Sequence, residues 1–117
     1  MNAVENPYAG QGPVLLDIGG RVGALVIAMP PWLSGVEIEA RPASYDERRP
    51  LPHVAVIDRG EYRYSAVFAE LEEGSYALYE RPAGPVRLTT TVTGGQVTYT
   101  TWPAQGTSSR GSRRGKR

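Results

Sequence analysis

Short segments rich in Val, Ile, Tyr and Thr, interrupted by glycine and proline clusters, make up the chain between Val14 and Trp102. The interruptions come roughly every 8–12 residues, a spacing typical of β-sandwiches and β-barrels. Glu70–Glu73 contains helix-forming residues, but it is too short for a helix and runs directly into Gly74. The pattern therefore predicts an all-β fold, an antiparallel β-sandwich of about seven or eight strands.

Two segments indicate how the strands should be buried. Residues Val36–Arg41 alternate between apolar and charged side chains, so one face should lie against the core and the other in solvent. The inward positions are Val36, Ile38 and Ala40, and the outward positions are Glu37, Glu39 and Arg41. In contrast, Ala24–Met29 is apolar at every position, which indicates a strand covered on both faces by a loop or by a partner chain.

Two hairpins are predicted. His53–Arg59 and Tyr62–Ala69 flank the turn residues Asp58–Glu61, and Tyr62, Tyr64, Ala66 and Phe68 should share a face. A two-residue turn at Gly94 and Gly95 predicts a second hairpin, in which a cation–π contact between Arg87 and Trp102 contributes about 0.5–1 kcal/mol. One face of this ladder would carry Leu88, Thr90, Val92, Val97, Tyr99 and Thr101, and the other Arg87, Thr89, Thr91, Thr98, Thr100 and Trp102.

Composition divides the chain into three parts: residues 1–13 as a flexible N-terminal lead, 14–103 as the sandwich domain, and 104–117 as a disordered basic tail. The tail has no apolar residue larger than alanine, so burial cannot offset the entropy lost on ordering it. Its basic residues are Arg110, Arg113, Arg114, Lys116 and Arg117. Residues 1–109 carry eight basic and twelve acidic residues, a net charge of −4, so an acidic body precedes a basic tail.

The amino-acid composition excludes several classes of site. The chain has no cysteine and one histidine, which excludes Cys/His zinc sites, thiol nucleophiles and iron–sulfur clusters. The longest apolar run, Ala24–Met29, is far shorter than the roughly 18 residues of a membrane helix, and Met1–Pro13 is polar and unlike a signal peptide. We therefore expect a cytoplasmic protein without a membrane partner.

The residues that could carry catalysis form no recognisable set. His53 is the one ready general base, but it opens a strand after Pro50-Leu51-Pro52, where an imidazole more often caps a loop. Glu37 and Glu39 share a solvated strand face, and Asp17–Gly23 lacks both the glycine spacing and the following helix of a phosphate-binding loop. These observations predict a non-enzymatic protein without a cofactor.

The segment from Ala66 to Leu78 resembles a signature of prealbumin-like β-sandwiches, the Cna-B and carboxypeptidase-regulatory-like domains, written F-x-x-L-x-x-G-x-Y-x-L. Phe68, Leu71, Gly74, Tyr76 and Leu78 occupy its positions. The resemblance implies that Phe68 and Leu71 fill the core, Gly74 makes a turn, and Tyr76 begins the next strand. It favours an immunoglobulin-like or prealbumin-like sandwich that acts as a spacer, adhesion or interaction module. The predicted core comprises Phe68, Tyr76, Leu78, Leu88, Val92 and Val97.

The enzymes of the wider transthyretin-like group, the hydroxyisourate hydrolases, use several histidines and a C-terminal Tyr-Arg-Gly-Ser. Here Ser109 precedes Arg110-Gly111-Ser112, and five more residues follow. Isopeptide-forming Cna-B domains need a core lysine, whereas the one lysine here is Lys116 in the tail. The resemblance therefore implies neither chemistry for this chain.

The sequence thus predicts an interaction or assembly module that binds another protein or itself. Candidate partner-binding residues are Trp32, Leu33, Tyr45, Arg48, Arg49 and His53, from an apolar turn and a polar Tyr/Arg loop. An alternative is nucleic-acid binding, in which the five basic tail residues contact phosphates or an acidic surface without reading bases. A third possibility is an enzyme or ligand carrier that uses His53 with the loop Ala43–Pro50.

Overall fold

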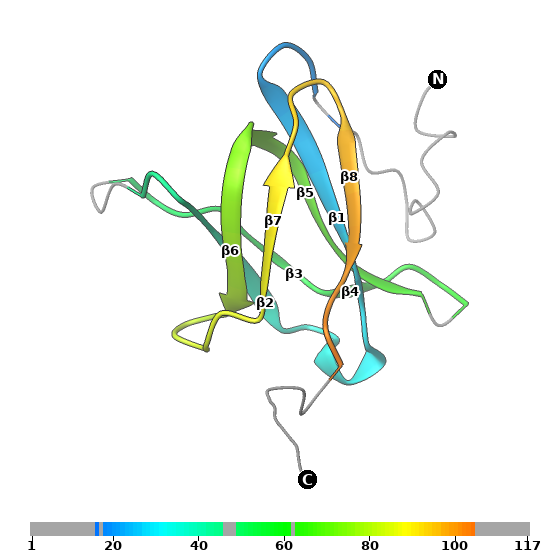
Figure 1. The fold of residues 1–117 in the computed structure, drawn as a ribbon. Coiled ribbons are helices and arrows are strands. Elements are labelled where there is room, and N and C mark those ends of the chain that lie inside the picture. The colour runs from blue at the N-terminus through cyan, green and yellow to red at the C-terminus, as the bar shows by residue number, and fades with distance from the viewer. Residues whose placement is uncertain (1–15, 17, 46–48, 62, 105–117) are drawn as a thin grey trace, which may run out of the picture.

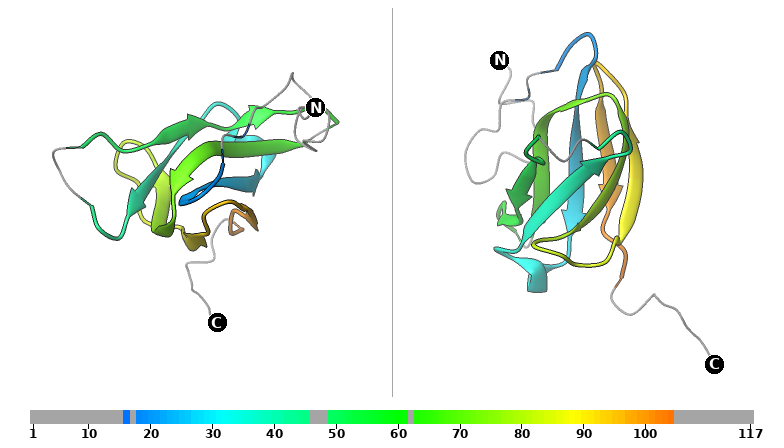
Figure 2. Two further views of the ribbon diagram at one scale, coloured as in Figure 1. Left: turned by 90° about the horizontal axis from the view of Figure 1, so that it is seen from above. Right: turned by 90° about the vertical axis from the view of Figure 1, so that its left-hand side faces the viewer.

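The computed structural model describes residues 16, 18–45, 49–61 and 63–104. These residues contain eight β-strands and one 3-10 turn, Pro31–Leu33. The strands form two four-stranded sheets that lie against each other as two layers (Figure 1, Figure 2). The all-β sandwich predicted from the spacing of glycine and proline is therefore confirmed.

The first sheet has the strand order β4-β5-β1-β8. Its strands are β1 (Val22–Met29), β4 (Ile57–Asp58), β5 (Tyr64–Glu72) and β8 (Val97–Thr101). β1 pairs antiparallel with β5 along its whole length and parallel with β8. The parallel pairing departs from the wholly antiparallel sandwich that the sequence predicts.

The second sheet has the order β3-β2-β6-β7, and all of its pairings are antiparallel. Its strands are β2 (Glu37–Pro42), β3 (His53–Ala55), β6 (Gly74–Glu80) and β7 (Leu88–Val92). The chain moves from one sheet to the other between β1 and β2, β3 and β4, β5 and β6, and β7 and β8. These four connections link the two sheets covalently at both ends of the sandwich.

The hydrophobic core lies between the two sheets and draws on both. The first sheet contributes Leu25, Ile27, Met29, Ala66, Phe68 and Leu71, and the second contributes Ile38, Ala40, Tyr76, Leu78 and Val92. Val56, at the crossing between β3 and β4, and Trp102, just after β8, complete the cluster. Burial of such side chains is worth roughly 1.5–3 kcal/mol each, so this layer provides the main stabilisation of the fold.

The prediction for Ala24–Met29 is confirmed, and the prediction for Val36–Arg41 is confirmed in part, because the Glu39 side chain is only 14 % exposed. In β2, Ile38 and Ala40 are fully buried, whereas Glu37 and Arg41 are exposed. In β1, Leu25 and Ile27 face the core, and Val26 on the other face is also buried. Val26 lies between Val67 of β5 and Tyr99 of β8 in the register of the first sheet.

The first predicted hairpin is confirmed in part. β4 pairs with β5, and the turn between them is closed by hydrogen bonds from Arg59 N to Arg63 O (2.6 Å) and from Gly60 N to Asp58 Oδ1 (2.8 Å). Tyr64, Ala66 and Phe68 share the inward face as predicted, and Tyr62 lies outside the described residues. The predicted strand His53–Arg59, however, is two strands, because the chain changes sheets at Val56.

The second predicted hairpin is wrong. β7 pairs with β6 in the second sheet and β8 pairs with β1 in the first sheet, so the turn around Gly94 and Gly95 joins two layers rather than two neighbouring strands. The predicted core position of Val97 is also wrong, because Val97 is half-buried beside Ala24, away from the core. Leu88 is half-buried and packs against the core.

The contact between Arg87 and Trp102 forms despite the wrong pairing. The Arg87 guanidinium carbon lies 6.0 Å from the centre of the Trp102 ring, within the range of a cation–π interaction. The ring itself belongs to the core and is 4 % exposed. Arg87 Nη2 also donates to Ala104 O at 3.3 Å, so this arginine holds the end of the described chain against the sandwich.

Several predictions fall on residues that the structure does not describe. They are the lead at residues 1–13, the basic tail beyond Ala104, and Arg48 of the β2–β3 connection. In the described part of the chain, no helix has the length and hydropathy needed to cross a membrane.

Candidate functional site

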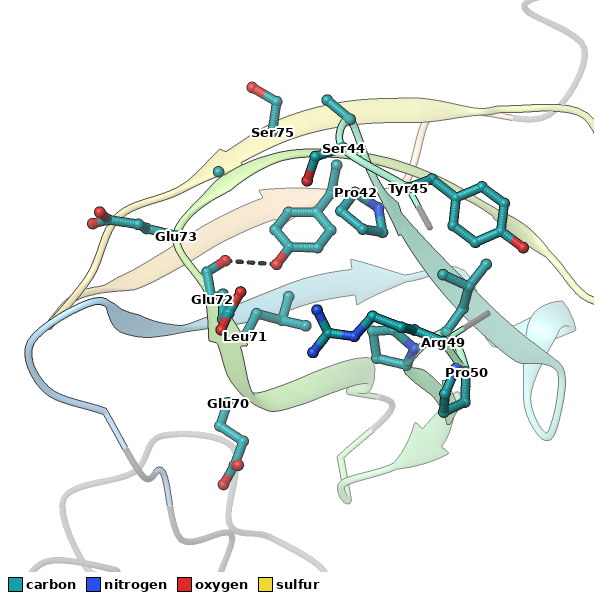
Figure 3. A pocket seen from close by; sticks show the side chains of 15 residues that line it. Pro42, Ser44, Tyr45, Arg49, Pro50, Glu70, Leu71, Glu72, Glu73 and Ser75 are labelled. Atoms are coloured by element: carbon teal, nitrogen blue, oxygen red, sulfur yellow. Dashed lines mark hydrogen bonds between the residues drawn. The ribbon is translucent and has the colours of Figure 1, made fainter. Parts of the chain in front are cut away.

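A cavity of about 520 Å³ opens at one end of the sandwich. One wall is the chain that follows β2, residues 42–45 and 49–52, and the other is the end of β5 with the start of β6, residues 70–76. We call this hollow the end cavity (Figure 3). Its volume is in the range of ligand-binding clefts.

The two walls are brought together by the register of the second sheet. Pro42 is the partner of Tyr76, and Ala43 N donates to Ser75 O at 2.9 Å. The β2–β3 connection therefore leaves the sheet directly beside the β5–β6 turn. The connection returns to the sheet at Pro52, where Ala40 N donates to Pro52 O at 3.0 Å, so both ends of this wall are fixed to β2.

The β5–β6 turn matches the local structure that the signature residues imply. Phe68 and Leu71 are buried in the core, Gly74 has a φ of +147°, and Tyr76 and Leu78 are buried in β6. The Tyr76 hydroxyl donates to Glu72 O at 2.6 Å and so closes the turn on itself. The core positions of Phe68 and Leu71 are confirmed, whereas β6 begins at Gly74, two residues before Tyr76. Membership of a particular sandwich family stays a prediction.

The floor of the end cavity is largely apolar and shares two side chains with the core, and Arg49 lies across part of it (Figure 3). Leu71 is 4 % exposed and Tyr76 is 6 % exposed, and both also line the cavity. Leu51 adds a half-buried side chain from the opposite wall. Because two floor residues are held by core packing, the hollow is part of the folded scaffold rather than of a loose loop.

The rim of the end cavity is predominantly acidic. Its described lining carries the carboxylates of Glu70, Glu72 and Glu73 and the guanidinium of Arg49. Figure 3 shows Arg49 extending across the floor toward Leu71, whereas Glu70 and Glu73 point outward. Glu73 pairs with Arg21 at 3.4 Å between exposed side chains. Burial, and then the negative charge of Glu72, raise the pKa of the Tyr76 hydroxyl above its usual value.

A second polar cluster covers the outer face of the second sheet. Arg81 bridges Glu37 (2.5 Å) and Glu39 (3.0 Å), and the Tyr79 hydroxyl donates to Glu39. Arg41 lies over the Tyr79 ring at 5.1 Å. Burial and the hydrogen bond to Glu39 raise the pKa of Tyr79. Both carboxylates pair with Arg81, and Arg41 adds a second positive charge to the cluster, so the cluster stabilises the sheet face.

The predicted partner-binding residues divide between the two ends of the molecule. Tyr45 and Arg49 line the end cavity, and Arg41 stacks on the Tyr45 ring at 5.7 Å. His53 is exposed on β3, with Nδ1 3.2 Å from Leu51 O. Trp32 and Leu33 lie in the 3-10 turn after β1, at the other end of the sandwich. The structure therefore separates the apolar turn from the Tyr/Arg loop.

The wall of the end cavity formed by residues 70–76 was not predicted from the sequence. Glu70, Glu72 and Glu73 gave a signal, three carboxylates within four positions, but nothing in the sequence places them beside residues 42–45 and 49–52. The local contact of His53 agrees with a loop-capping role. Among the described residues, no group of three or more His, Cys, Asp or Glu side chains could hold a metal ion.

Comparisons of the chain with protein-family models, with curated proteins and with solved structures found no match.

Proposed function

We propose that this domain is a non-enzymatic interaction module that binds an extended segment of a protein in the end cavity. The observation that carries the proposal is a preformed hollow of about 520 Å³ whose apolar floor is built from core residues. A cavity of this size accepts a few side chains of a peptide, and its rigid floor keeps the ordering cost of binding low.

The charges of the rim favour a particular partner chemistry. Glu70 and Glu72 are exposed carboxylates beside an apolar floor. Arginine and lysine side chains suit such a surface, because their aliphatic stems cover apolar groups while their charged ends reach carboxylates. The proposed ligand is thus a segment that mixes basic and small or apolar residues.

The same charges disfavour nucleic acid as a ligand of the cavity, since carboxylates repel phosphates. Nucleic-acid binding through Arg110, Arg113, Arg114, Lys116 and Arg117 stays the second hypothesis, and it rests on the composition of the tail alone. An enzymatic role for His53 has less support, because the ring nitrogen contacts a backbone carbonyl.

The test is selection of peptides from a random displayed library on the full chain. The wild-type protein should select related sequences enriched in Arg or Lys beside apolar residues. The variant Glu70→Gln/Glu72→Gln should bind the selected peptides at least ten times more weakly, while Glu61→Gln, the same change on the exposed β4–β5 turn, should bind them as the wild type does. Selection of no related sequences, or equal binding by both variants, would contradict the proposal.

A further inference from the structure

The end cavity and the point where the described chain stops lie at opposite ends of the sandwich. Glu72 pairs with Val22 at the start of β1, so the end cavity lies at that end. At the other end of β1, Trp102 N donates to Ala28 O at 2.9 Å, so the chain beyond β8 leaves from there. Figure 1 shows β8 ending near the turn that follows β1. The described chain therefore stops one strand length away from the cavity.

The end opposite to the cavity also exposes an aromatic side chain. Trp32, in the 3-10 turn Pro31–Leu33, is 64 % exposed, although its neighbour Leu33 packs against the core. Tryptophan is enriched among the residues that contribute most to binding at protein interfaces. Exposed Trp32 thus lies at the end from which residues 105–117 leave. The end cavity with its acidic rim lies at the other end.

The charges of the two parts are complementary. Residues 1–104 contain eight basic and twelve acidic residues, whereas residues 105–117 contain five basic and no acidic residues. Glu70 and Glu72 have no ion pair among the described residues, and both stand on the wall of the end cavity. The chain thus contains a segment with the chemistry that the cavity is proposed to bind.

We propose that residues 105–117 of one copy bind in the end cavity of a second copy, so that the copies associate head to tail. This inference rests on the proposed function of the cavity and names its ligand. The arginine and lysine stems would cover the floor at Leu71 and Tyr76 while their charged ends pair with Glu70 and Glu72. Trp32 of the donating copy approaches the same rim, because it lies at the end from which the segment leaves.

The segment is long enough to reach either cavity, but the end of the sandwich from which it leaves favours the cavity of a neighbouring copy. The eight residues of β1 span about 25 Å, and thirteen residues reach at most about 45 Å when fully extended. Within one molecule the segment would have to turn back along the outside of the sandwich before its basic residues reached the rim. A copy stacked end to end presents its cavity directly to the segment. Such contacts join two different surfaces, so they continue into a chain or close into a ring.

The experiment uses two full-length variants and their mixture. The cavity variant is Glu70→Gln/Glu72→Gln, and the tail variant replaces Arg110, Arg113, Arg114, Lys116 and Arg117 by glutamine. Sedimentation equilibrium across a concentration series measures the mass. We expect the wild-type mass to rise above that of a monomer with concentration and to fall with salt, because exposed ion pairs are screened. Each variant alone should associate at least ten times more weakly.

The mixture provides the decisive result. The cavity variant keeps an intact tail and the tail variant keeps an intact cavity, so an equimolar mixture should form dimers and nothing larger. Glu61→Gln should associate as the wild type does. A wild-type chain that stays monomeric, or a mixture that forms no dimer, would overturn the head-to-tail proposal.

The two proposals can fail separately. If the wild-type chain stays monomeric but selects displayed peptides that the cavity variant fails to bind, the cavity is an interaction site and its ligand is another protein. If the chain neither associates nor selects peptides, both proposals are wrong. Peptide selection is repeated on the tail variant, so that a bound tail cannot hide an active cavity.

Discussion

Tyr76 connects the core, the β5–β6 turn and the end cavity. Its ring is 6 % exposed and packs in the core, its hydroxyl bonds to Glu72 O at 2.6 Å, and it forms part of the cavity floor. The sequence indicated the burial of this residue through its neighbours Phe68, Leu71 and Leu78. The hydrogen bond and the place in the floor depend on the shape of the turn and on the wall that faces it.

Replacement of Tyr76 by phenylalanine should lower the free energy of unfolding by about 1 kcal/mol, because one neutral hydrogen bond is lost while the ring stays buried. Urea denaturation at pH 7 measures the change. Tyr45→Phe, at an exposed position of the β2–β3 connection, is the matched control and should change stability by less than about 0.5 kcal/mol. Equal effects of the two changes would show that the hydrogen bond contributes nothing.

Alkaline pH should destabilise the fold through Tyr76 and Tyr79. Burial raises the pKa of both hydroxyls in the folded state, whereas the unfolded chain titrates near a pKa of about 10. The folded state therefore holds these protons more tightly, so their contribution is fully present below about pH 10 and is lost as pH rises further. Urea denaturation between pH 8 and pH 11 should show this loss, and Tyr76→Phe/Tyr79→Phe should reduce its slope.

Phe68 fills the centre of the core, and Phe68→Ala should cost about 3–5 kcal/mol because it leaves a cavity between the sheets. Thermal or urea denaturation measures the loss. The exposed substitution Thr89→Ala on β7 serves as the control and should stay within about 0.5 kcal/mol of the wild type. An unchanged melting midpoint for Phe68→Ala would contradict the central position of this ring.

At the scale of elements, the turn between β7 and β8 shows where local pattern and tertiary structure differ. Inward-facing and outward-facing side chains alternate along β7 and along β8, but the two strands belong to different sheets. Leu88 and Val92 face the core from the second sheet. Thr98 and Thr100 pair with Leu25 and Ile27 of the first sheet. Trp102 follows at the same two-residue spacing, and its ring is buried in the core. Only this crossing buries Val92 and Trp102 in one core, because a flat hairpin would place them on opposite faces.

The crossing depends on a close approach of backbones at Gly94. A Cβ atom there would clash with Gly20 O and lie 2.8 Å from Arg21 Cα. The turn is also bonded to β1, with Gly95 N donating to Val22 O at 2.9 Å and Ala24 N to Gln96 O at 3.0 Å. The β7–β8 turn therefore packs directly on the turn that precedes β1.

Gly94→Ala should lower the free energy of unfolding by about 2 kcal/mol, since the neighbouring atoms belong to the backbone and cannot move aside cheaply. The exposed neighbour Thr93 provides the control, and Thr93→Ala should cost less than about 0.5 kcal/mol. Chemical denaturation of both variants tests the packing of the two turns. If Gly94→Ala is as stable as Thr93→Ala, the close approach is wrong.

At the scale of the whole molecule, stability and assembly are carried by different parts of the chain. Every residue of the described core cluster lies between Leu25 and Trp102, whereas the proposed assembly requires residues 105–117. Arg87 marks the boundary, since it contacts both Trp102 and Ala104. The division of the chain near residue 103 stays a prediction.

Truncation after Gln105 should leave the melting temperature of dilute protein within about 2 °C of the full chain, because no described core residue is removed and the change in stability should stay below about 0.5 kcal/mol. Differential scanning calorimetry at low concentration and high salt, where head-to-tail contacts are suppressed, measures it. A drop of 5 °C or more would show that the tail contributes to the fold itself.

The sequence by itself determined the strand class, the alternation of β2, the burial of both faces of β1 and the presence of a turn directly before Gly74. These features depend on a few consecutive residues, because side-chain period and turn chemistry are local. Only the tertiary structure decided that β7 and β8 belong to different sheets, that β8 runs parallel to β1, and that residues 42–45 and 49–52 stand opposite residues 70–76. Each of these depends on contacts between segments far apart in the chain, which alternation along one strand does not encode. The loop residues Tyr45 and Arg49 could therefore be selected from their chemistry, but the cavity they line could not.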